Sequence, residues 1–241
     1  MSKELIIRKL NILIENYNNG LIPKLHEHEV NPGLEIGSRE NYLYFTLPVS
    51  LNFQRSSPSM WKAALETWED PETNYLYFPE KVVDKNFEEL QRDLVKHKLA
   101  LQKNKHVQIW QRISTTLYEK YSSDPRLIFK YTQRCVTRTK NLIVENKKEF
   151  PYLAGPKMSN YWLYILDQFT DIKLRNKHKI SIIPDTHVIQ SSIKLGIIKV
   201  KIKPEDVALK WFDLLKDTKF STTTLHPILW NWSRNNFLPK V

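Results

Sequence analysis

Two side chains stand in patterns that could carry chemistry, a lysine just after a short glycine turn and an aspartate at the start of a helical pattern. Lys157 follows Gly155 in FPYLAGPKMSN, residues 150–160, and Asp185 follows Pro184 in IIPDTHVIQSSIKLGI, residues 182–197. A lysine amine can attack an electrophilic carbon, and a carboxylate can stabilise positive charge that develops during a reaction. The simpler alternatives are an exposed surface lysine and a helix N-cap aspartate.

The elements that must position these residues are helices. Apolar residues recur three and four positions apart in most of the chain after residue 80, the spacing of one helix face. We expect helices at 3–17, from Ser59, and at 82–102, 105–121, 124–146, 157–170, 186–195, 204–216 and 223–236. Residues 18–58 are expected to be irregular, with NYLYFTLPV, residues 41–49, as a short strand or an extended arm.

The predicted fold class is all-α, with an irregular N-terminal segment. We expect residues 1–80 to contribute a helix, an irregular arm and a further helix that pack on a helical body, residues 81–241. Within that body, residues 150–157 would form a hairpin between two helices. Neither an internal repeat nor a low-complexity linker interrupts the sequence.

The composition restricts the class of protein. Thirty-seven Lys and Arg against 26 Asp and Glu give a formal net charge of +11, which favours an anionic partner, with nucleic acid before a membrane surface. No run approaches the roughly 18 apolar residues of a membrane-spanning helix. The first 17 residues lack signal-peptide features, so we expect a cytoplasmic (nucleoid) or nuclear protein.

Metal and cofactor sites are not expected. The single cysteine, Cys135, excludes an internal disulfide and any four-cysteine cluster. His26 and His28 stand two positions apart without a third partner, which is a weak pattern for a metal. No glycine-rich phosphate loop is present, so a nucleotide cofactor is not expected either.

Residues 150–197 resemble the helix-hairpin-helix DNA glycosylases, the superfamily of endonuclease III and 8-oxoguanine DNA glycosylase. Asp-Thr-His-Val at 185–188, followed by Lys-Leu-Gly at 194–196, is similar to the D-T-H-V…R-L-G segment of that family. The family's L-P-G-V-G-x-K hairpin aligns with PYLAGPK, which places Gly155 and Lys157 in register. The resemblance extends over roughly residues 105–236, and the two motifs occur in the family's order.

The chain departs from the family pattern at three places, one of which is Pro184 directly before Asp185, where most relatives have one residue between the two. Tyr152 and Leu153 stand where the family has its proline and its first hairpin glycine. Lys157 and Asp185 lie 28 residues apart, a longer interval than in most of the superfamily. An insertion at this place is known among the archaeal 8-oxoguanine glycosylases, so the chain resembles a divergent branch of that kind.

The resemblance implies base-excision repair of DNA. In the bifunctional members a lysine forms a Schiff base that later permits strand cleavage, and Lys157 would be that residue. Asp185 would be the carboxylate that stabilises the positively charged sugar. The amine must be unprotonated to attack, and we expect the apolar sequence MSNYWLYIL to bury it. Lysine-bearing members without an iron–sulfur cluster are mostly 8-oxoguanine enzymes, which implies an oxidised purine as substrate.

A surface for double-stranded DNA with a damaged base is expected beside the hairpin. Lys130, Arg134 and Arg138 are four apart on the predicted helix 124–146, which would align them as one basic stripe with Lys140 nearby. Gly155 would let the hairpin approach a phosphate closely, and the basic insert KLRNKHK, residues 173–179, could follow a backbone. A flipped base needs aromatic side chains, for which Trp230 and Trp232 are the candidates.

Two other functions remain open from the sequence. One is a non-catalytic nucleic-acid-binding protein that keeps the same helical body and charge. The other is a glycosidase of the same fold that acts on a modified nucleoside. We expect a monomer without membrane association in each case, and the role of Lys157 separates the first prediction from these alternatives.

Overall fold

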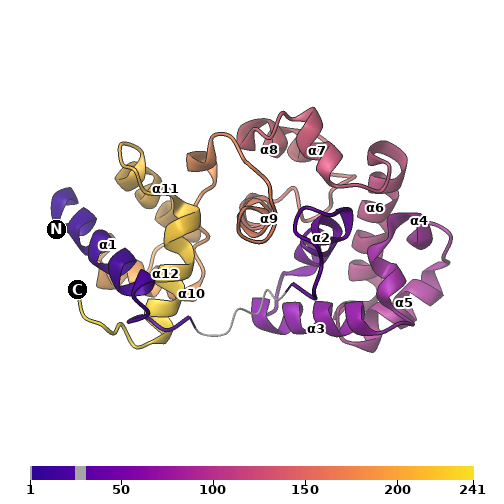
Figure 1. The fold of residues 1–241 in the computed structure, drawn as a ribbon, viewed down its shortest axis with the longest axis horizontal. Coiled ribbons are helices and arrows are strands. Elements are labelled where there is room, and N and C mark those ends of the chain that lie inside the picture. Colours follow the sequence, from indigo (N-terminus) through magenta and orange to yellow (C-terminus); the bar gives the residue numbers. More distant parts are fainter. Residues whose placement is uncertain (1, 25–30) are drawn as a thin grey trace. The chain divides into compact units, whose positions relative to one another are not determined.

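The protein is all-helical in the parts of the chain that its computed structural model describes, residues 2–24 and 31–241. These residues form two compact units, and Figure 1 shows the helices of each. We call residues 31–176 the hairpin unit, and residues 2–24 with 177–241 the terminal unit. The predicted all-α class is confirmed. His26 and His28 lie outside the described residues.

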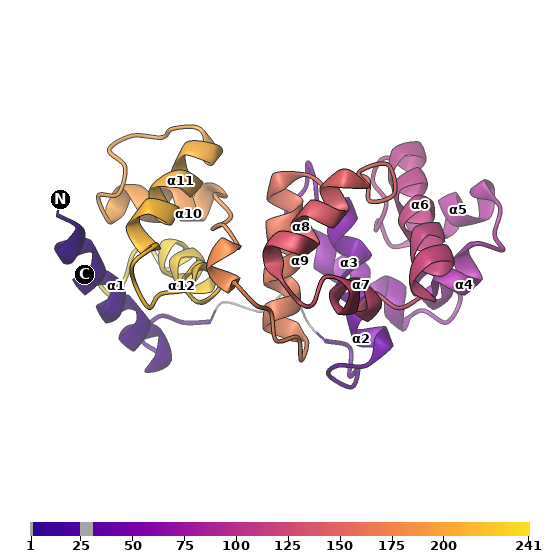
Figure 2. The ribbon, with the colours of Figure 1, turned by 90° about the horizontal axis from the view of Figure 1, so that it is seen from above.

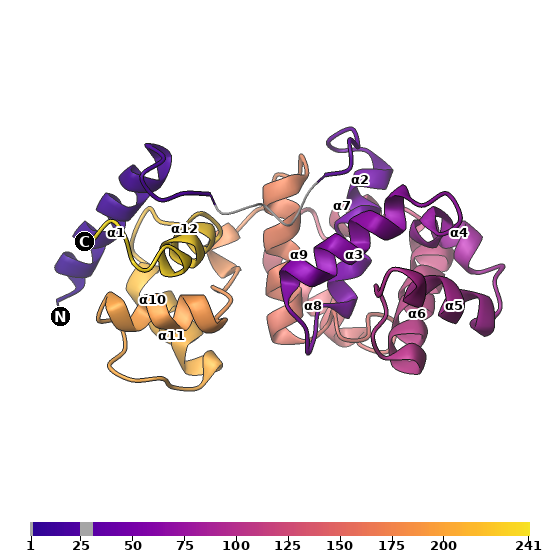
Figure 3. The same cartoon turned by 90° about the horizontal axis from the view of Figure 1, so that it is seen from below.

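The terminal unit joins the two ends of the chain around one core. Its elements are α1 (Lys3–Asn18), η3 (Lys177–Lys179), α10 (Thr186–Lys194), α11 (Pro204–Leu215) and α12 (Thr222–Arg234). Leu10 and Leu13 of α1 belong to the same buried cluster as Trp211 of α11 and Trp232 of α12. Helices α10 and α12 lie side by side in this unit, as Figures 2 and 3 show.

The hairpin unit contains a longer series of helices. They are α2 (Arg39–Tyr44), η1 (Pro48–Leu51), α3 (Ser57–Glu69), η2 (Asn74–Tyr77), α4 (Pro79–Val82), α5 (Phe87–Lys96), α6 (Lys103–Tyr121), α7 (Arg126–Tyr131), α8 (Val136–Glu145) and α9 (Pro156–Phe169). Local signals start several of them, including the side chain of Ser56 before α3 and the capping box of Asn86 and Glu89 in α5. Helix α9 is buried along most of its length, from Met158 to Leu166.

The expected strand at residues 41–49 is wrong, because the segment folds into α2 and the start of η1. Residues 41–51 are all buried. Polar groups within the segment bond to α9, since the Asn41 side chain donates to the Phe169 carbonyl at 3.2 Å and the Trp162 indole donates to Thr46 Oγ1 at 3.0 Å. A segment buried on every side loses the one-sided periodicity that identifies a helix in a sequence.

The two units divide the chain at other places than the predicted boundary at residue 80. Helix α1 packs with the C-terminal helices, whereas residues 31–80 share a core with α6 and α9. Tyr77 meets Trp110 of α6 edge to face at 5.6 Å between ring centroids, and the Trp61 indole donates to the Tyr161 hydroxyl at 2.9 Å. These contacts join residues far apart in the sequence, so periodicity alone could not place the boundary.

The predicted continuous helix 124–146 is also wrong, because the chain breaks it into α7 and α8. Gln133 and Arg134 adopt left-handed backbone conformations with φ of 54° and 55°. The buried Thr132 hydroxyl bonds to the Ile128 carbonyl and to Thr139 Oγ1, which holds the break in place. Two consecutive left-handed residues cannot continue a right-handed helix, so α8 restarts at Val136.

Candidate active site and nucleic-acid interface

The segment between α8 and α9 forms a compact hairpin, residues 146–155. The amides of Glu149 and Phe150 donate to the Asn146 carbonyl at 2.8 and 3.1 Å, and the Ala154 amide donates to the Phe150 carbonyl at 3.0 Å. Phe150 and Leu153 are buried beneath the turn. The hairpin is therefore fixed by its own backbone bonds and by apolar anchors, and it delivers the chain directly to the first turn of α9.

Gly155 closes the hairpin at a position where the backbone passes close to itself. Its amide donates to the Tyr152 carbonyl at 3.0 Å, and a Cβ atom added at Gly155 would lie 3.1 Å from that same oxygen. A side chain at this position would be in tight contact with the turn, and the Tyr152 carbonyl would have to move by a few tenths of an ångström. Gly155 is also the N-cap residue of α9, so the glycine sets where the helix begins.

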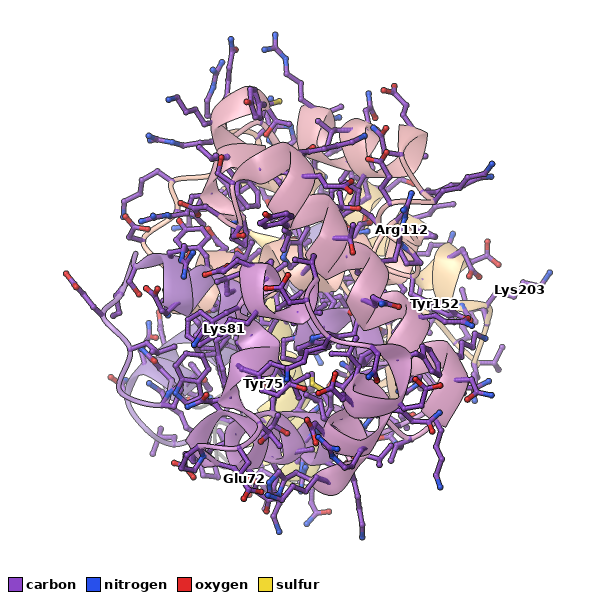
Figure 4. All side chains as sticks on the ribbon, turned by 90° about the vertical axis from the view of Figure 1, so that its right-hand side faces the viewer. Glu72, Tyr75, Lys81, Arg112, Tyr152 and Lys203 are labelled. Carbon is purple, nitrogen blue, oxygen red and sulfur yellow. The ribbon has the colours of Figure 1, made fainter. Side chains whose placement is uncertain are left out.

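Tyr152 takes the strained position of the hairpin. Its φ of 61° lies in the left-handed region, which costs roughly 1–2 kcal/mol for a residue with a side chain. The ring stacks on Phe53 with 4.0 Å between centroids and 10° between planes, and the Lys105 ammonium lies over it at 4.8 Å. Figure 4 labels Tyr152 among the side chains of the molecule. The stacking on Phe53 and the contact with the Lys105 ammonium offset the backbone strain, which a glycine at position 152 would not have.

Lys157 is the second residue of α9 and is exposed. Pro156 occupies the first position, where the missing N–H is of no consequence. The expectation that MSNYWLYIL buries the amine differs from the structure, because residues 158–166 are themselves buried whereas Lys157, which precedes them in the first turn of α9, is exposed. Trp162, for example, is fully buried and bonds to Thr46. The amine stands at the accessible end of the helix.

Lys140 lies on α8 and is held against α9 rather than on an open surface. Its ammonium donates to Asn160 Oδ1 at 3.1 Å, and the Asn160 side chain is buried. Burial lowers the pKa of Lys140, because an ammonium loses hydration when it leaves water. The sequence prediction placed this lysine among general DNA-binding cations, whereas the structure places it beside the first turns of the helix that carries Lys157.

The predicted basic stripe is not a feature of one helix face, because α7 ends between Lys130 and Arg134. The side chains of Lys130, Arg134 and Arg138 are nevertheless exposed, and Arg138 donates to Gln133 Oε1 at 2.5 Å. The basic insert contributes Arg175, whose amide donates to the Arg134 carbonyl at 2.7 Å. Tertiary contacts therefore bring two arginines from separate segments to the turn that precedes α8.

Asp185 is the N-cap of α10 in the terminal unit. Its carboxylate accepts the Val188 N–H at 2.8 Å, and its backbone is extended, as an N-cap residue requires. The side chain is partly exposed. Burial lowers the pKa of the neighbouring His226 imidazole, and the negative charge of Asp185 opposes that shift. The Asp185 carboxylate is thus held through one oxygen by the Val188 N–H, and its negative charge acts on the His226 imidazole.

The residues next to Asp185 form a polar and aromatic group across α10 and α12. The His187 ring meets Trp230 edge to face at 5.3 Å between centroids, and His187 Nδ1 lies 3.2 Å from the Ser233 hydroxyl. The Arg234 guanidinium lies 4.7 Å above the Trp230 ring. Trp230 is partly exposed beside the aspartate segment.

Trp232 occupies a different environment from Trp230. Its side chain is 1% exposed, it meets Phe237 edge to face at 5.0 Å, and its indole N–H donates to the Pro239 carbonyl at 2.9 Å. It is a core residue of the terminal unit, so the structure removes it from the base-pocket candidates. Residues two apart on a helix point in different directions, which explains why only one tryptophan of the pair faces the core.

Lys157 and Asp185 belong to different units, and each is positioned within its own unit by the contacts described above. In the described residues no group of three His, Cys, Asp or Glu side chains could hold a metal ion. A separate search of the same residues finds no helix that is long and apolar enough to span a membrane.

Comparison with known proteins gives a structural match. No protein-family model and no curated protein matches the sequence. A solved structure of a trapped endonuclease III–DNA covalent intermediate, the estranged-adenine complex, matches with a TM-score of 0.61 and 16% sequence identity. The match covers 98% of this chain and 87% of that chain. The chain has the endonuclease III fold. The resemblance of residues 150–197 to the superfamily is thereby supported at the level of fold, while the 8-oxoguanine branch is not distinguished.

The sequence did not reveal two contacts that position the hairpin. The first is the stack of Tyr152 on Phe53, and the second is the bond from Lys140 to Asn160. An aromatic residue at the place of the family's proline was the one available signal for the first contact. The second had no signal, since a lysine and an asparagine 20 positions apart do not form a recognisable pattern.

Proposed function

We propose that this protein is a DNA base-excision glycosylase with AP lyase activity. The observation that carries the proposal is the placement of Lys157 directly after a glycine-closed hairpin, together with Asp185 as the cap of α10 in the D-T-H-V segment. Both residues occur in a chain whose fold is similar to that of endonuclease III, a protein captured in a covalent intermediate with DNA.

In the proposed reaction the carboxylate of Asp185 stabilises the positive charge that the sugar acquires as the bond from C1′ to the base breaks. The base leaves with the bonding electron pair, and the unprotonated amine of Lys157 forms a new bond to C1′. The bonded nitrogen then gives one proton to the departing base and its second proton to O4′ as the bond from C1′ to O4′ breaks, which opens the sugar ring and leaves a Schiff base. Removal of a proton from C2′ then expels the 3′ phosphate by β-elimination.

The local structure of Asp185 is compatible with this role. One carboxylate oxygen accepts the Val188 N–H, and a carboxylate has several acceptor positions, so the cap does not consume its capacity. Fixing the side chain at a helix start also reduces the reorganisation needed when the sugar becomes charged. The N-cap and catalytic roles therefore reinforce one another.

Binding to DNA is supported by charge and by the exposed cations of the hairpin unit. The net charge of +11 favours contact with a polyanion. Arg134 and Arg138 are exposed, Arg175 is brought beside Arg134 by backbone bonding, and Gly155 keeps the hairpin free of a projecting side chain. We propose that these residues contact phosphates of double-stranded DNA.

For the damaged base we propose an oxidised purine such as 8-oxoguanine. The support is the superfamily resemblance combined with the single cysteine, which excludes a four-cysteine iron–sulfur cluster. Trp230, partly exposed beside the aspartate segment, is the proposed aromatic contact for the flipped base.

The test is borohydride trapping on matched duplexes that contain 8-oxoguanine, an oxidised pyrimidine, an abasic site or no lesion. We expect a covalent adduct with the 8-oxoguanine and abasic duplexes, and none with intact DNA. Lys157→Ala should abolish the adduct, whereas Lys62→Ala, which removes an exposed lysine of α3, should leave it unchanged. An undiminished adduct in Lys157→Ala would overturn the residue assignment.

The alternatives give different outcomes in the same experiment. A non-catalytic nucleic-acid-binding protein would shift the mobility of every duplex without any adduct or base release. A nucleoside glycosidase would release base from a free modified nucleoside and leave the duplex intact. If an adduct formed only with the duplex that contains the oxidised pyrimidine, the protein would still be a glycosylase with lyase activity. Its substrate would then be an oxidised pyrimidine instead of an oxidised purine.

A further inference from the structure

We propose that Lys140 is a positioning residue for Lys157, acting through Asn160 on the backbone of the first turn of α9. The inference rests on the proposed function, because it concerns the amine that would attack the sugar. Lys140 and Asn160 come from the two helices that flank the hairpin. Their contact therefore connects the helices on either side of the turn that delivers Lys157.

A continuous series of hydrogen bonds links Lys140 to the peptide group that carries Lys157. The Lys140 ammonium donates to Asn160 Oδ1 at 3.1 Å, and Asn160 Nδ2 donates to the Pro156 carbonyl at 2.6 Å. That carbonyl belongs to the peptide bond between Pro156 and Lys157. The Ser159 hydroxyl donates to the same oxygen at 3.2 Å. Movement of Lys140 would thus displace the backbone of Lys157, the proposed nucleophile.

The lysine determines which way the asparagine amide faces. A lysine has only donors, so it requires the oxygen of Asn160 to point toward α8 and leaves the nitrogen to bond Pro156. The reversed amide would place two donors against each other at Lys140 and two acceptors against each other at Pro156. Asn160 is 7% exposed, so water could do little to relieve such a mismatch.

The position of the pair makes it relevant to the reaction. Lys157 and Asn160 are three residues apart, which places their Cβ atoms about 5–6 Å from one another on the helix. Reacting atoms must be held close to attack geometry, and a displacement of about 1 Å can slow a reaction roughly 100-fold. The hydrogen bonds from Lys140 to Asn160 and from Asn160 to the Pro156 carbonyl, which we call the brace, would fix the backbone position from which the flexible Lys157 side chain extends.

The experiment compares single-turnover trapping rates on the abasic duplex with binding to the intact duplex. We expect Lys140→Met, which keeps the aliphatic stem and removes the donor, to slow trapping at least about 10-fold with DNA affinity unchanged. Lys140→Arg should restore most of the rate, because a guanidinium also donates to Asn160 Oδ1. The double variant Lys140→Met/Asn160→Ala should trap no more slowly than Asn160→Ala alone.

Three results would overturn the inference. Trapping by Lys140→Met at the wild-type rate would show that the brace is dispensable. A loss of DNA affinity equal to the loss of rate would make Lys140 a phosphate contact. If Lys140→Arg restored the stability of the protein but not the trapping rate, Lys140 would act through packing and not through its hydrogen bond to Asn160.

A second measurement separates this inference from the proposed function. Amide hydrogen exchange over residues 155–161 reports the order of the first turn of α9 without any catalytic step. We expect faster exchange there in Lys140→Met than in the wild type, whether or not the wild type forms an adduct. No adduct with the wild type would defeat the proposed function, whereas unchanged exchange in Lys140→Met would defeat the brace.

Discussion

The hairpin segment, residues 146–160, and the aspartate segment, residues 182–197, carry the two candidate catalytic groups but hold them by different means. Asp185 is fixed locally, by a bond to the amide three residues later. The hairpin also has local backbone bonds, yet its shape depends on Phe53, which stacks on Tyr152, and on Lys140, which bonds Asn160. One segment is specified by its neighbours in sequence, the other largely by distant residues.

The difference explains why the two motifs resemble the superfamily to different degrees. A local cap requires a particular residue at a particular place, and Asp185 supplies it at the start of D-T-H-V, residues 185–188. A hairpin supported from outside can differ from L-P-G-V-G-x-K, because stacking on Phe53 offsets the cost of a left-handed Tyr152, which stands at the place of that pattern's proline. The departure at Tyr152 is therefore compensated within this unit.

The largest effect is expected at the aspartate segment. Asp185→Asn removes the charge but keeps an oxygen that can accept the Val188 N–H, so base release should fall roughly 100- to 1,000-fold with little change in stability. Asp185→Ala should in addition lose the cap, at a cost of about 1 kcal/mol. Base release and urea unfolding of both variants measure this. If Asp185→Asn lost DNA affinity and kept its rate, Asp185 would be structural alone.

The support of the hairpin should weaken in acid. His106 packs edge to face on Phe53 at 4.7 Å, and burial, followed by the positive charges of Arg55 and Lys105, lowers its pKa to about 4. Because the folded pKa lies below the ordinary 6.5, the neutral imidazole stabilises the fold above pH 6.5, and this contribution is lost as the pH falls toward 4.

Urea unfolding between pH 7 and 4 tests this expectation. His106→Gln keeps an acceptor for the Leu101 N–H, which bonds His106 Nδ1 at 3.2 Å, and cannot titrate. The wild-type midpoint should fall more steeply with acid than that of the variant, and the difference should be greatest near pH 4. Parallel curves would mean that His106 does not link pH to this region.

A smaller effect should distinguish the strain at Tyr152 from its stacking. Tyr152→Gly and Tyr152→Ala both remove the ring, but only glycine adopts a φ of 61° freely, so Tyr152→Gly should be more stable than Tyr152→Ala by about 1 kcal/mol. Phe53→Ala should destabilise the wild type more than it destabilises Tyr152→Gly. Equal stability of the two Tyr152 variants would show that the turn relaxes without the ring.

The smallest effect concerns the cations of the hairpin unit. Arg134→Ala and Arg138→Ala should each weaken DNA binding uniformly across sequences and reduce the slope of log affinity against log salt by about 1. Arg134→Lys is the matched control and should keep the slope, because it keeps the charge. A slope unaffected by both alanine variants would remove this surface from the DNA contact.

The sequence by itself determined the all-α class and the boundaries of helices with clear caps, and it supplied the two candidate catalytic groups that we propose. Helix α10 begins where Asp185 predicts, and α9 begins at Pro156 after Gly155. These features depend on interactions within a few residues, such as the N-cap bond and the fixed φ of proline, so they are visible in a local pattern.

Only the tertiary structure decided the remainder. It joined α1 to the C-terminal helices, folded residues 41–49 as helix, broke the predicted helix at Gln133 and assigned Trp232 to the core. It also brought Lys140 to Asn160 and Phe53 to Tyr152. Apart from the break at Gln133, which the bonds of Thr132 to Ile128 and Thr139 hold, these features depend on contacts between residues distant in the chain. The energies of such contacts override local preference, and the contacts produce no periodic pattern in the sequence.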